Sequence, residues 1–329
     1  MRPLTKLSAP DPPVITGLAC SSSRRRRLSS HDPMALALVP LRLRFSMPGT
    51  AHPGHYLGSA WRGAFGHALK KLVCLFSQGH CENCPVKKTC AYTTVFESKW
   101  IFDPKAASGG VPAPYTMFPA LEDGKMSLYM TVIGSRALGF LPFILQALRQ
   151  AGASRVAQIP FTLATNEYFN GTQWQKLQLP AESLVQIPEC QPGAMSLQLL
   201  TPARFKYQGH FITPKTLNLE HWITALRRRL ISLASFWGEE NSMRALCEVS
   251  TVGQWQATDC RWQEMERYSS RQKTAMKIGG VMGNFTLTNE QAQGIWSLLW
   301  LGQWVHIGKL ATMGLGRYAL TSTNQGEAG

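Results

Sequence analysis

The chain has 329 residues, of which 44% are hydrophobic, and its formal net charge at pH 7 is +15. This apolar content supplies a sizeable core and argues against global disorder, and no apolar run reaches the roughly 18 residues that span a bilayer. The excess of 34 Lys and Arg over 19 Asp and Glu predicts a polyanionic partner. We expect nucleic acid and no membrane, because no basic amphipathic helix dominates the sequence.

Residues 1–33 are rich in Pro, Ser and Arg, with four arginines in a row from Arg24 to Arg27. This composition cannot bury an apolar face, so it predicts a disordered basic tail or an unused upstream start, with Met34 opening the folded part. An RNA-binding arm and an Arg-rich transit peptide are weaker alternatives. The segment lacks the apolar core of a secretory signal, and we expect a cytoplasmic protein.

The first folded elements have clear periodicity. Residues 36–45 end in alternating Leu and Arg and predict a half-buried strand. Apolar residues then recur at helical spacing and predict an amphipathic helix over 56–73. The opposite flank of this helix carries His67 and Lys70 among small residues, so we expect a ligand backbone to approach there.

Four of the eight cysteines follow that helix within seventeen residues: Cys74, Cys81, Cys84 and Cys90. Such a local cluster is not the disulfide framework of a secreted domain. Four thiolates at short spacing suit tetrahedral zinc or an iron–sulfur cluster. The sequence therefore predicts a structural metal site, with His80 as a substitute ligand and reduced free thiols as the alternative.

The remainder of the first half is less regular. Residues 103–125 contain Pro, Gly and Ser and predict a loop. A strand over 126–132 and a helix over 138–148 follow, and residues 155–190 suggest two or three strands of irregular length. We place a domain boundary near residues 188–192.

The second half has a simpler order. Its expected elements are a strand at 196–201, a helix at 217–237, strands at 255–262 and 276–287, a helix at 290–301 and a last strand at 318–320. This βαββαβ order is a ferredoxin-like unit, and the first half fits a looser copy. The predicted fold is α+β, with two tandem ferredoxin-like domains over 34–190 and 191–322 and a cysteine-rich insertion over 74–98. Two such units side by side form a natural cleft for RNA.

A glycine-rich loop lies between the last helix and the last strand. It contains Gly308, Gly314 and Gly316, interleaved with Lys309 and Arg317. Glycines let backbone N–H groups approach an anion closely, so the loop predicts contacts with phosphate. The sequence lacks the features of a Walker loop or a dinucleotide-binding fingerprint. The alternative is a loop that only makes a turn.

Three motifs together resemble a known family. They are Leu-Thr-Pro-Ala-Arg-Phe-Lys at 200–206, the basic turn and glycines over 268–283, and the loop His-x-Gly, five residues, Gly-x-Gly at 306–316. The pattern is similar to that of the CRISPR precursor-crRNA processing endoribonucleases of the RAMP superfamily, the sixth Cas family. Residues 61–69 and the cysteines up to Cys90-Ala91-Tyr92 resemble one branch of it. His306 stands where the family's loop has its first glycine.

The resemblance implies two tandem ferredoxin-like domains that bind CRISPR repeat RNA, and an association with other Cas proteins of an effector complex. It also implies cleavage without a metal cofactor, in which the ribose 2′-OH attacks the adjacent phosphate and leaves a 2′,3′-cyclic phosphate. This chemistry needs a base for the 2′-OH, an acid for the leaving 5′-oxygen and cations at the phosphorane.

The family often places a catalytic His on or just after the first helix. We therefore name His67 first, followed by His80 and His55. The expected RNA-binding residues are Arg204, Lys206, Arg271, Lys273, His306, Gly308, Lys309, Gly314, Gly316 and Arg317. Two alternatives remain open: a catalytically silent subunit that holds crRNA, and a zinc-knuckle protein that binds nucleic acid.

Overall fold

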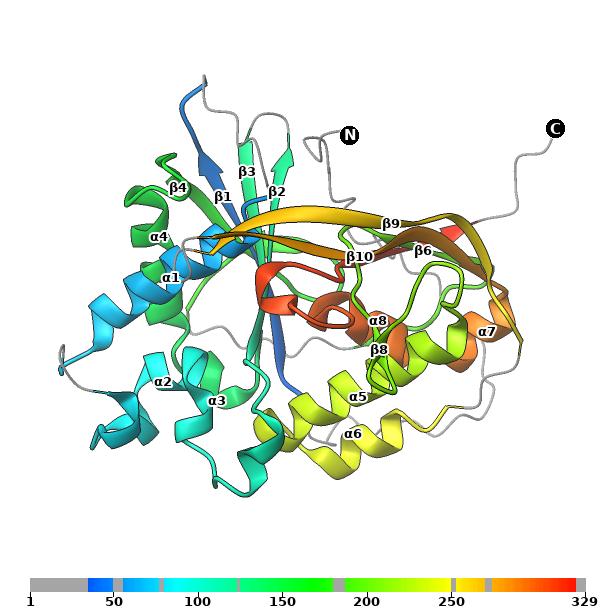
Figure 1. Cartoon of the computed structure of the whole chain (residues 1–329), viewed down its shortest axis with the longest axis horizontal. Coiled ribbons are helices and arrows are strands. Elements are labelled where there is room, and N and C mark those ends of the chain that lie inside the picture. The colour runs from blue at the N-terminus through cyan, green and yellow to red at the C-terminus, as the bar shows by residue number, and fades with distance from the viewer. Residues whose placement is uncertain are drawn as a thin grey trace.

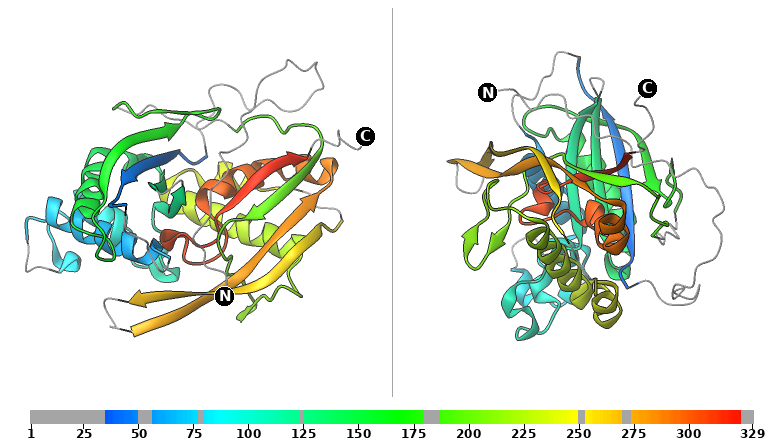
Figure 2. Two further views of the ribbon diagram at one scale, coloured as in Figure 1. Left: turned by 90° about the horizontal axis from the view of Figure 1, so that it is seen from above. Right: turned by 90° about the vertical axis from the view of Figure 1, so that its right-hand side faces the viewer.

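The computed structural model describes residues 35–49, 56–76, 80–122, 125–179, 187–249, 253–269 and 274–323. The predicted basic tail therefore lies outside the described residues. Two antiparallel sheets stand beside each other, each with helices on one face, and the long β9–β10 hairpin reaches from the second sheet toward the first (Figures 1 and 2).

The N-terminal domain is built on a five-stranded sheet in the order β2-β3-β1-β4-β5. Its main elements are β1 (Leu38–Ser46), α1 (Gly58–Val73), β2 (Tyr115–Glu122), β3 (Lys125–Ile133), α3 (Ser135–Leu138), α4 (Leu141–Ala153), β4 (Thr162–Phe169) and β5 (Trp174–Lys176). The chain between α1 and β2 forms η1 (Cys81–Asn83), η2 (Lys87–Thr89), α2 (Ala91–Phe96), η3 (Ser98–Trp100) and η4 (Ala106–Gly109). Apart from β5, the strand order is that of a ferredoxin-like unit.

The C-terminal domain has a four-stranded sheet in the order β11-β6-β10-β9. Its elements are β6 (Ala194–Leu199), β7 (Lys206–Tyr207), β8 (His210–Phe211), α5 (Leu219–Trp237), α6 (Glu240–Leu246), β9 (Gln256–Ser269), β10 (Thr274–Leu287), α7 (Asn289–Gly294), α8 (Trp296–Val305), η5 (Ala311–Met313) and β11 (Tyr318–Thr323). The same ferredoxin-like order appears again, which confirms the prediction of tandem ferredoxin-like domains.

Two expectations about local structure were wrong, and one element was not predicted. Residues 115–122 are a strand and not a loop; β2 is buried on both faces, so it lacks the alternation that marks a strand. The predicted helix over 290–301 is two helices, which meet at Ile295. The small β7–β8 hairpin was not predicted, because two-residue strands have no detectable period.

The two domains pack tightly against each other. Phe118 and Tyr129 on the N-terminal sheet share a buried apolar cluster with Leu200 and Ala319 of the C-terminal domain. The Thr116 hydroxyl donates to the Trp304 carbonyl at 2.9 Å across the same boundary. The interface thus positions the loop after α8 against the first domain. Within the described ranges, no helix has the length and apolarity needed to cross a membrane.

Candidate nucleic-acid interface

The glycine-rich loop, which we define as residues 306–317, joins α8 to β11 and lies at the boundary of the two domains. Gly308, Gly314 and Gly316 have positive φ angles of 79°, 89° and 71°. A Cβ atom on Gly308 would lie 2.6 Å from the Arg204 carbonyl oxygen, and one on Gly316 would collide with the Ile307 carbonyl. These glycines are therefore required by close backbone packing and left-handed geometry.

The loop's backbone N–H groups are largely used within the protein. Ile307 N donates to Gly316 O at 2.9 Å, Lys309 N to Arg204 O at 3.1 Å, and Gly316 N to Pro202 O at 3.1 Å. An N–H group that already has a protein acceptor is not available to a phosphate. The expected cradle of free amides is accordingly replaced by a folded loop that presents the exposed side chain of Lys309.

His306 is an interior residue with a backbone conformation typical of glycine. Its φ is 59° and its ψ is 157°, a backbone conformation that residues other than glycine rarely adopt. The side chain is 2% exposed, and its Nδ1 lies 3.2 Å from the Leu315 carbonyl oxygen. Burial, together with the charges of Arg317 and Arg229, holds the pKa of His306 well below its ordinary value. The imidazole is therefore neutral near pH 7.

Arg317 is also inside the protein. Its side chain is 6% exposed, its guanidinium lies 5.1 Å from the centre of the Trp304 ring, and it donates to the Gln303 carbonyl. Burial lowers the pKa of Arg317 to about 10. The expectation that Arg317 and His306 contact RNA is thus not supported by their position, because the interface between the domains encloses both side chains.

Arg204 and Lys206 are better placed. Lys206 is exposed on β7, and Arg204 is half-buried two residues before it, where its carbonyl oxygen accepts a hydrogen bond from Lys309 N of the loop. The structure therefore brings three of the predicted cations together at one end of the loop. Arg271, Lys273 and His55 lie outside the described residues.

Helix α1 connects this loop to the predicted catalytic residues. A Cβ on Gly58, at the start of α1, would collide with the Met313 carbonyl of the loop, so the two segments touch. His67 is exposed nine residues further along, which is about 14 Å at 1.5 Å per residue. RNA held at the loop would therefore have to follow α1 to place a phosphate at His67. His80 is exposed beyond the end of the helix.

The small residues on the outer flank of α1 have two different explanations. Gly63 has open space around its Cβ position, as expected for a surface that a ligand could approach. Gly66 is buried instead, and a Cβ there would lie 2.9 Å from the Phe96 ring. A ligand backbone therefore cannot approach Gly66, because Phe96 of α2 covers it.

Lys70, on the same flank of α1, has a cation–π contact with α2: its ammonium lies 5.6 Å from the centre of the Tyr92 ring.

The four clustered cysteines are half-buried free thiols in the segment between α1 and α2. Burial raises the pKa of the Cys81 thiol; the charge of Lys70 acts in the opposite direction, and the charges of Glu97, Cys90 and Cys74 raise it further. In the part of the chain that the structure describes, no three His, Cys, Asp or Glu side chains gather closely enough to hold a metal ion. The predicted four-thiolate site of Cys74, Cys81, Cys84 and Cys90 is thus not assembled here.

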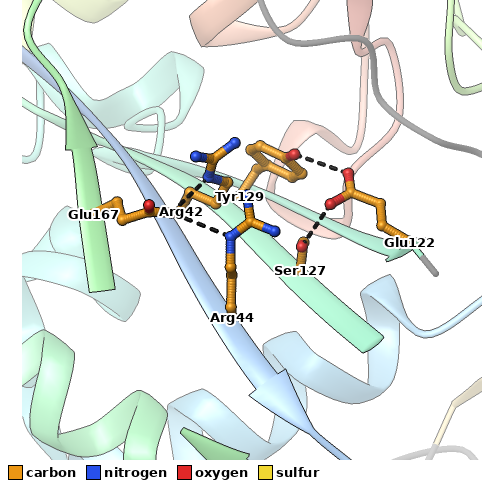
Figure 3. A network of polar contacts seen from close by, with 6 residues as sticks. All are labelled: Arg42, Arg44, Glu122, Ser127, Tyr129 and Glu167. Atoms are coloured by element: carbon orange, nitrogen blue, oxygen red, sulfur yellow. Dashed lines mark hydrogen bonds and ion pairs between the residues drawn. The ribbon is translucent and has the colours of Figure 1, made fainter. Parts of the chain in front are cut away.

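A polar network covers the face of the N-terminal sheet opposite its helices (Figure 3). Arg42 and Arg44 both donate to Glu167, at 2.7 and 3.2 Å, whereas the Ser127 and Tyr129 hydroxyls donate to Glu122. Partial burial raises the pKa of Glu167, but the hydrogen bonds and charges of the two arginines outweigh it, and the net shift is downward. These arginines are therefore engaged in ion pairs within the sheet.

Comparisons with known proteins agree with this architecture. Residues 36–187 match the family model AF_1859_N, described as an N-terminal domain, and residues 197–318 match the model of the CRISPR-associated endoribonuclease Cas6. An uncharacterized protein of Archaeoglobus fulgidus is 24% identical over 306 residues, which cover 88% of this chain and 99% of that protein.

Solved structures show the same fold. A product complex of Thermus thermophilus Cas6 has a TM-score of 0.50 at 16% identity, covering 86% of this chain and 100% of that chain. A chain of a partial Cas6-RT-Cas1–Cas2 complex has a TM-score of 0.51 at 12% identity, covering 88% of this chain and 47% of that chain.

The fold and the loop between the domains define a protein of two tandem ferredoxin-like domains arranged as in Cas6. The resemblance seen in the sequence is confirmed for the C-terminal domain, because residues 197–318 match the model of the CRISPR-associated endoribonuclease Cas6.

Proposed function

We propose that this protein matures CRISPR RNA by binding the repeat of the precursor transcript and cleaving it without a metal cofactor. The observation that carries the proposal is the Cas6 domain over residues 197–318, docked through its glycine-rich loop on the helix that bears an exposed His67. The net charge of +15 supports a polyanionic substrate.

In the proposed reaction, His67 accepts the proton of the ribose 2′-OH. The 2′-oxygen forms a bond to the adjacent phosphorus, the bond from phosphorus to the 5′-oxygen breaks, and a general acid protonates that oxygen. The products are a 2′,3′-cyclic phosphate and a 5′-hydroxyl. A base must be within hydrogen-bond reach of its proton, and an exposed imidazole on α1 meets this requirement better than the buried His306.

The test uses purified protein and labelled repeat RNA in excess EDTA. Cleavage at one position with a cyclic phosphate end is expected for the wild type. His67→Ala should lower the cleavage rate by about 100-fold or more while RNA affinity is retained. His80→Ala is assayed in parallel, because His80 is the second candidate for the base. A loss confined to His80→Ala would move the role of the base to that residue, and cleavage that EDTA abolishes would contradict the metal-independent mechanism.

The alternative is a silent subunit that holds crRNA within a larger assembly. It is favoured by the similarity to a chain of a structure described as a Cas6-RT-Cas1–Cas2 complex, in which Cas6 is named together with other Cas proteins. Tight binding of repeat RNA without cleavage by any preparation would support this alternative. Preference for DNA over RNA of the same sequence would contradict both functions.

A further inference from the structure

The β7–β8 hairpin presents two aromatic side chains to solvent next to the glycine-rich loop. Tyr207 is 36% exposed and Phe211 is 43% exposed. The hairpin turns through Gln208 and Gly209, whose φ angles of 45° and 88° fit the tight two-residue turn that suits a twisted hairpin. An exposed aromatic pair on a short hairpin adds no core packing, so it indicates a contact surface.

The Phe211 ring is held in position by a cation. In the antiparallel register Lys206 pairs with Phe211, so both side chains lie on one face of the hairpin. The Arg204 guanidinium lies 4.2 Å from the centre of the Phe211 ring on the same segment. On the other face, Tyr207 pairs with His210, and its ring packs edge-on against His221 at 5.0 Å between ring centres.

The segment of the chain that contains the hairpin is basic. Residues 190–219 contain no Asp or Glu but contain Arg204, Lys206 and Lys215. Lys309 N donates a hydrogen bond to the carbonyl oxygen of Arg204, two residues before β7. The exposed side chain of Lys309 therefore leaves the backbone close to the start of the hairpin. Rings next to cations are the combination that binds unpaired nucleotides, because bases stack on the rings and phosphates meet the cations.

We propose that the β7–β8 hairpin is a stacking site for unpaired RNA bases. Phe211 stacks on a base, Tyr207 offers a second ring on the opposite face, and Lys206 and Lys309 contact the flanking phosphates. This inference deepens the proposed function, on which it rests for the identity of the nucleic acid. Stacking is tolerant of sequence, so the hairpin would hold a single-stranded flank of the RNA without reading its bases.

The experiment measures binding without cleavage. The probe is a short oligoadenylate RNA with a central 2-aminopurine, whose fluorescence is quenched by stacking. Phe211→Ala and Phe211→Leu should each weaken binding by about tenfold and remove the quenching, because both lack the ring. Phe211→Leu keeps an apolar side chain and guards against a loss of folding. Phe143→Ala is the matched control, since Phe143 is 46% exposed on α4 of the other domain.

Salt dependence separates stacking from charge. Lys206→Gln should lower the slope of the logarithm of affinity against the logarithm of salt concentration, whereas Phe211→Leu should leave the slope unchanged. If Phe211→Leu binds and quenches like the wild type, or if Phe143→Ala loses as much affinity, the stacking site is refuted. Absence of binding by the wild type, or tighter binding of the oligodeoxyadenylate, also overturns it.

Cleavage of repeat RNA is assayed in parallel so that the two proposals can fail separately. Normal cleavage with no effect of Phe211→Leu on oligoadenylate binding removes the hairpin from the RNA surface and leaves the nuclease intact. Binding that depends on Phe211, without any cleavage by the wild type, keeps the stacking site and removes the enzymatic function.

Discussion

The backbone at His306 allows a test in which glycine is more stable than alanine. His306→Ala removes the hydrogen bond to Leu315, worth about 1 kcal/mol, and leaves a cavity that costs about 2 kcal/mol. His306→Gly loses the same contacts but relieves the φ 59°, ψ 157° conformation, which costs a side chain about 1–3 kcal/mol. After about 0.5–1 kcal/mol is subtracted for the greater entropy of unfolded glycine, the glycine variant should be more stable by about 1 kcal/mol.

Urea denaturation of both variants measures this difference in the free energy of unfolding. The control pair is His67→Ala and His67→Gly, at an exposed position inside α1. There the order should reverse, with glycine less stable by about 1 kcal/mol. If His306→Gly is no more stable than His306→Ala, the strain at this position is absent and the reasoning fails.

Three further predictions use the same structure. Because the pKa of His306 is lowered in the folded state, the unfolded state binds a proton first as pH falls below about 6.5, and wild-type stability should decline on acidification. This part of the decline should be missing in His306→Gln when the urea midpoints of the two proteins are compared across pH. Glu167→Gln should cost about 1–2 kcal/mol at pH 7 and little once the pH falls below the lowered pKa of Glu167 in the folded state, because the contribution of the carboxylate is lost when it is protonated. Equal losses on both sides of that transition would contradict the ion pair. Gly63→Ala should stabilise α1 by about 0.5–1 kcal/mol, since nothing lies near its Cβ position, whereas Gly66→Ala should gain less or destabilise through contact with Phe96, as thermal unfolding of the pair would show.

The sequence by itself determined the order of the main elements in the second half and the exposed flank of the first helix. The stripe that contains Trp61, Phe65 and Leu69 is buried, so His67 on the other side had to face outward. The three glycines of the loop also indicated unusual backbone geometry, and their φ angles are positive. These features are local, because they depend on residues within one or two turns of each other.

The tertiary structure decided which polar groups remain available to RNA. Arg317 and Lys309 look equivalent in the sequence, yet the packing of the second domain on the first encloses Arg317 and leaves Lys309 exposed. Long-range packing also explains why β2 was not predicted and why the amides of the loop already have hydrogen-bond acceptors. Burial on both faces and hydrogen bonds to Pro202 and Arg204 arise only when segments distant in sequence meet. Periodicity reports one face of an element, whereas accessibility depends on everything packed around it.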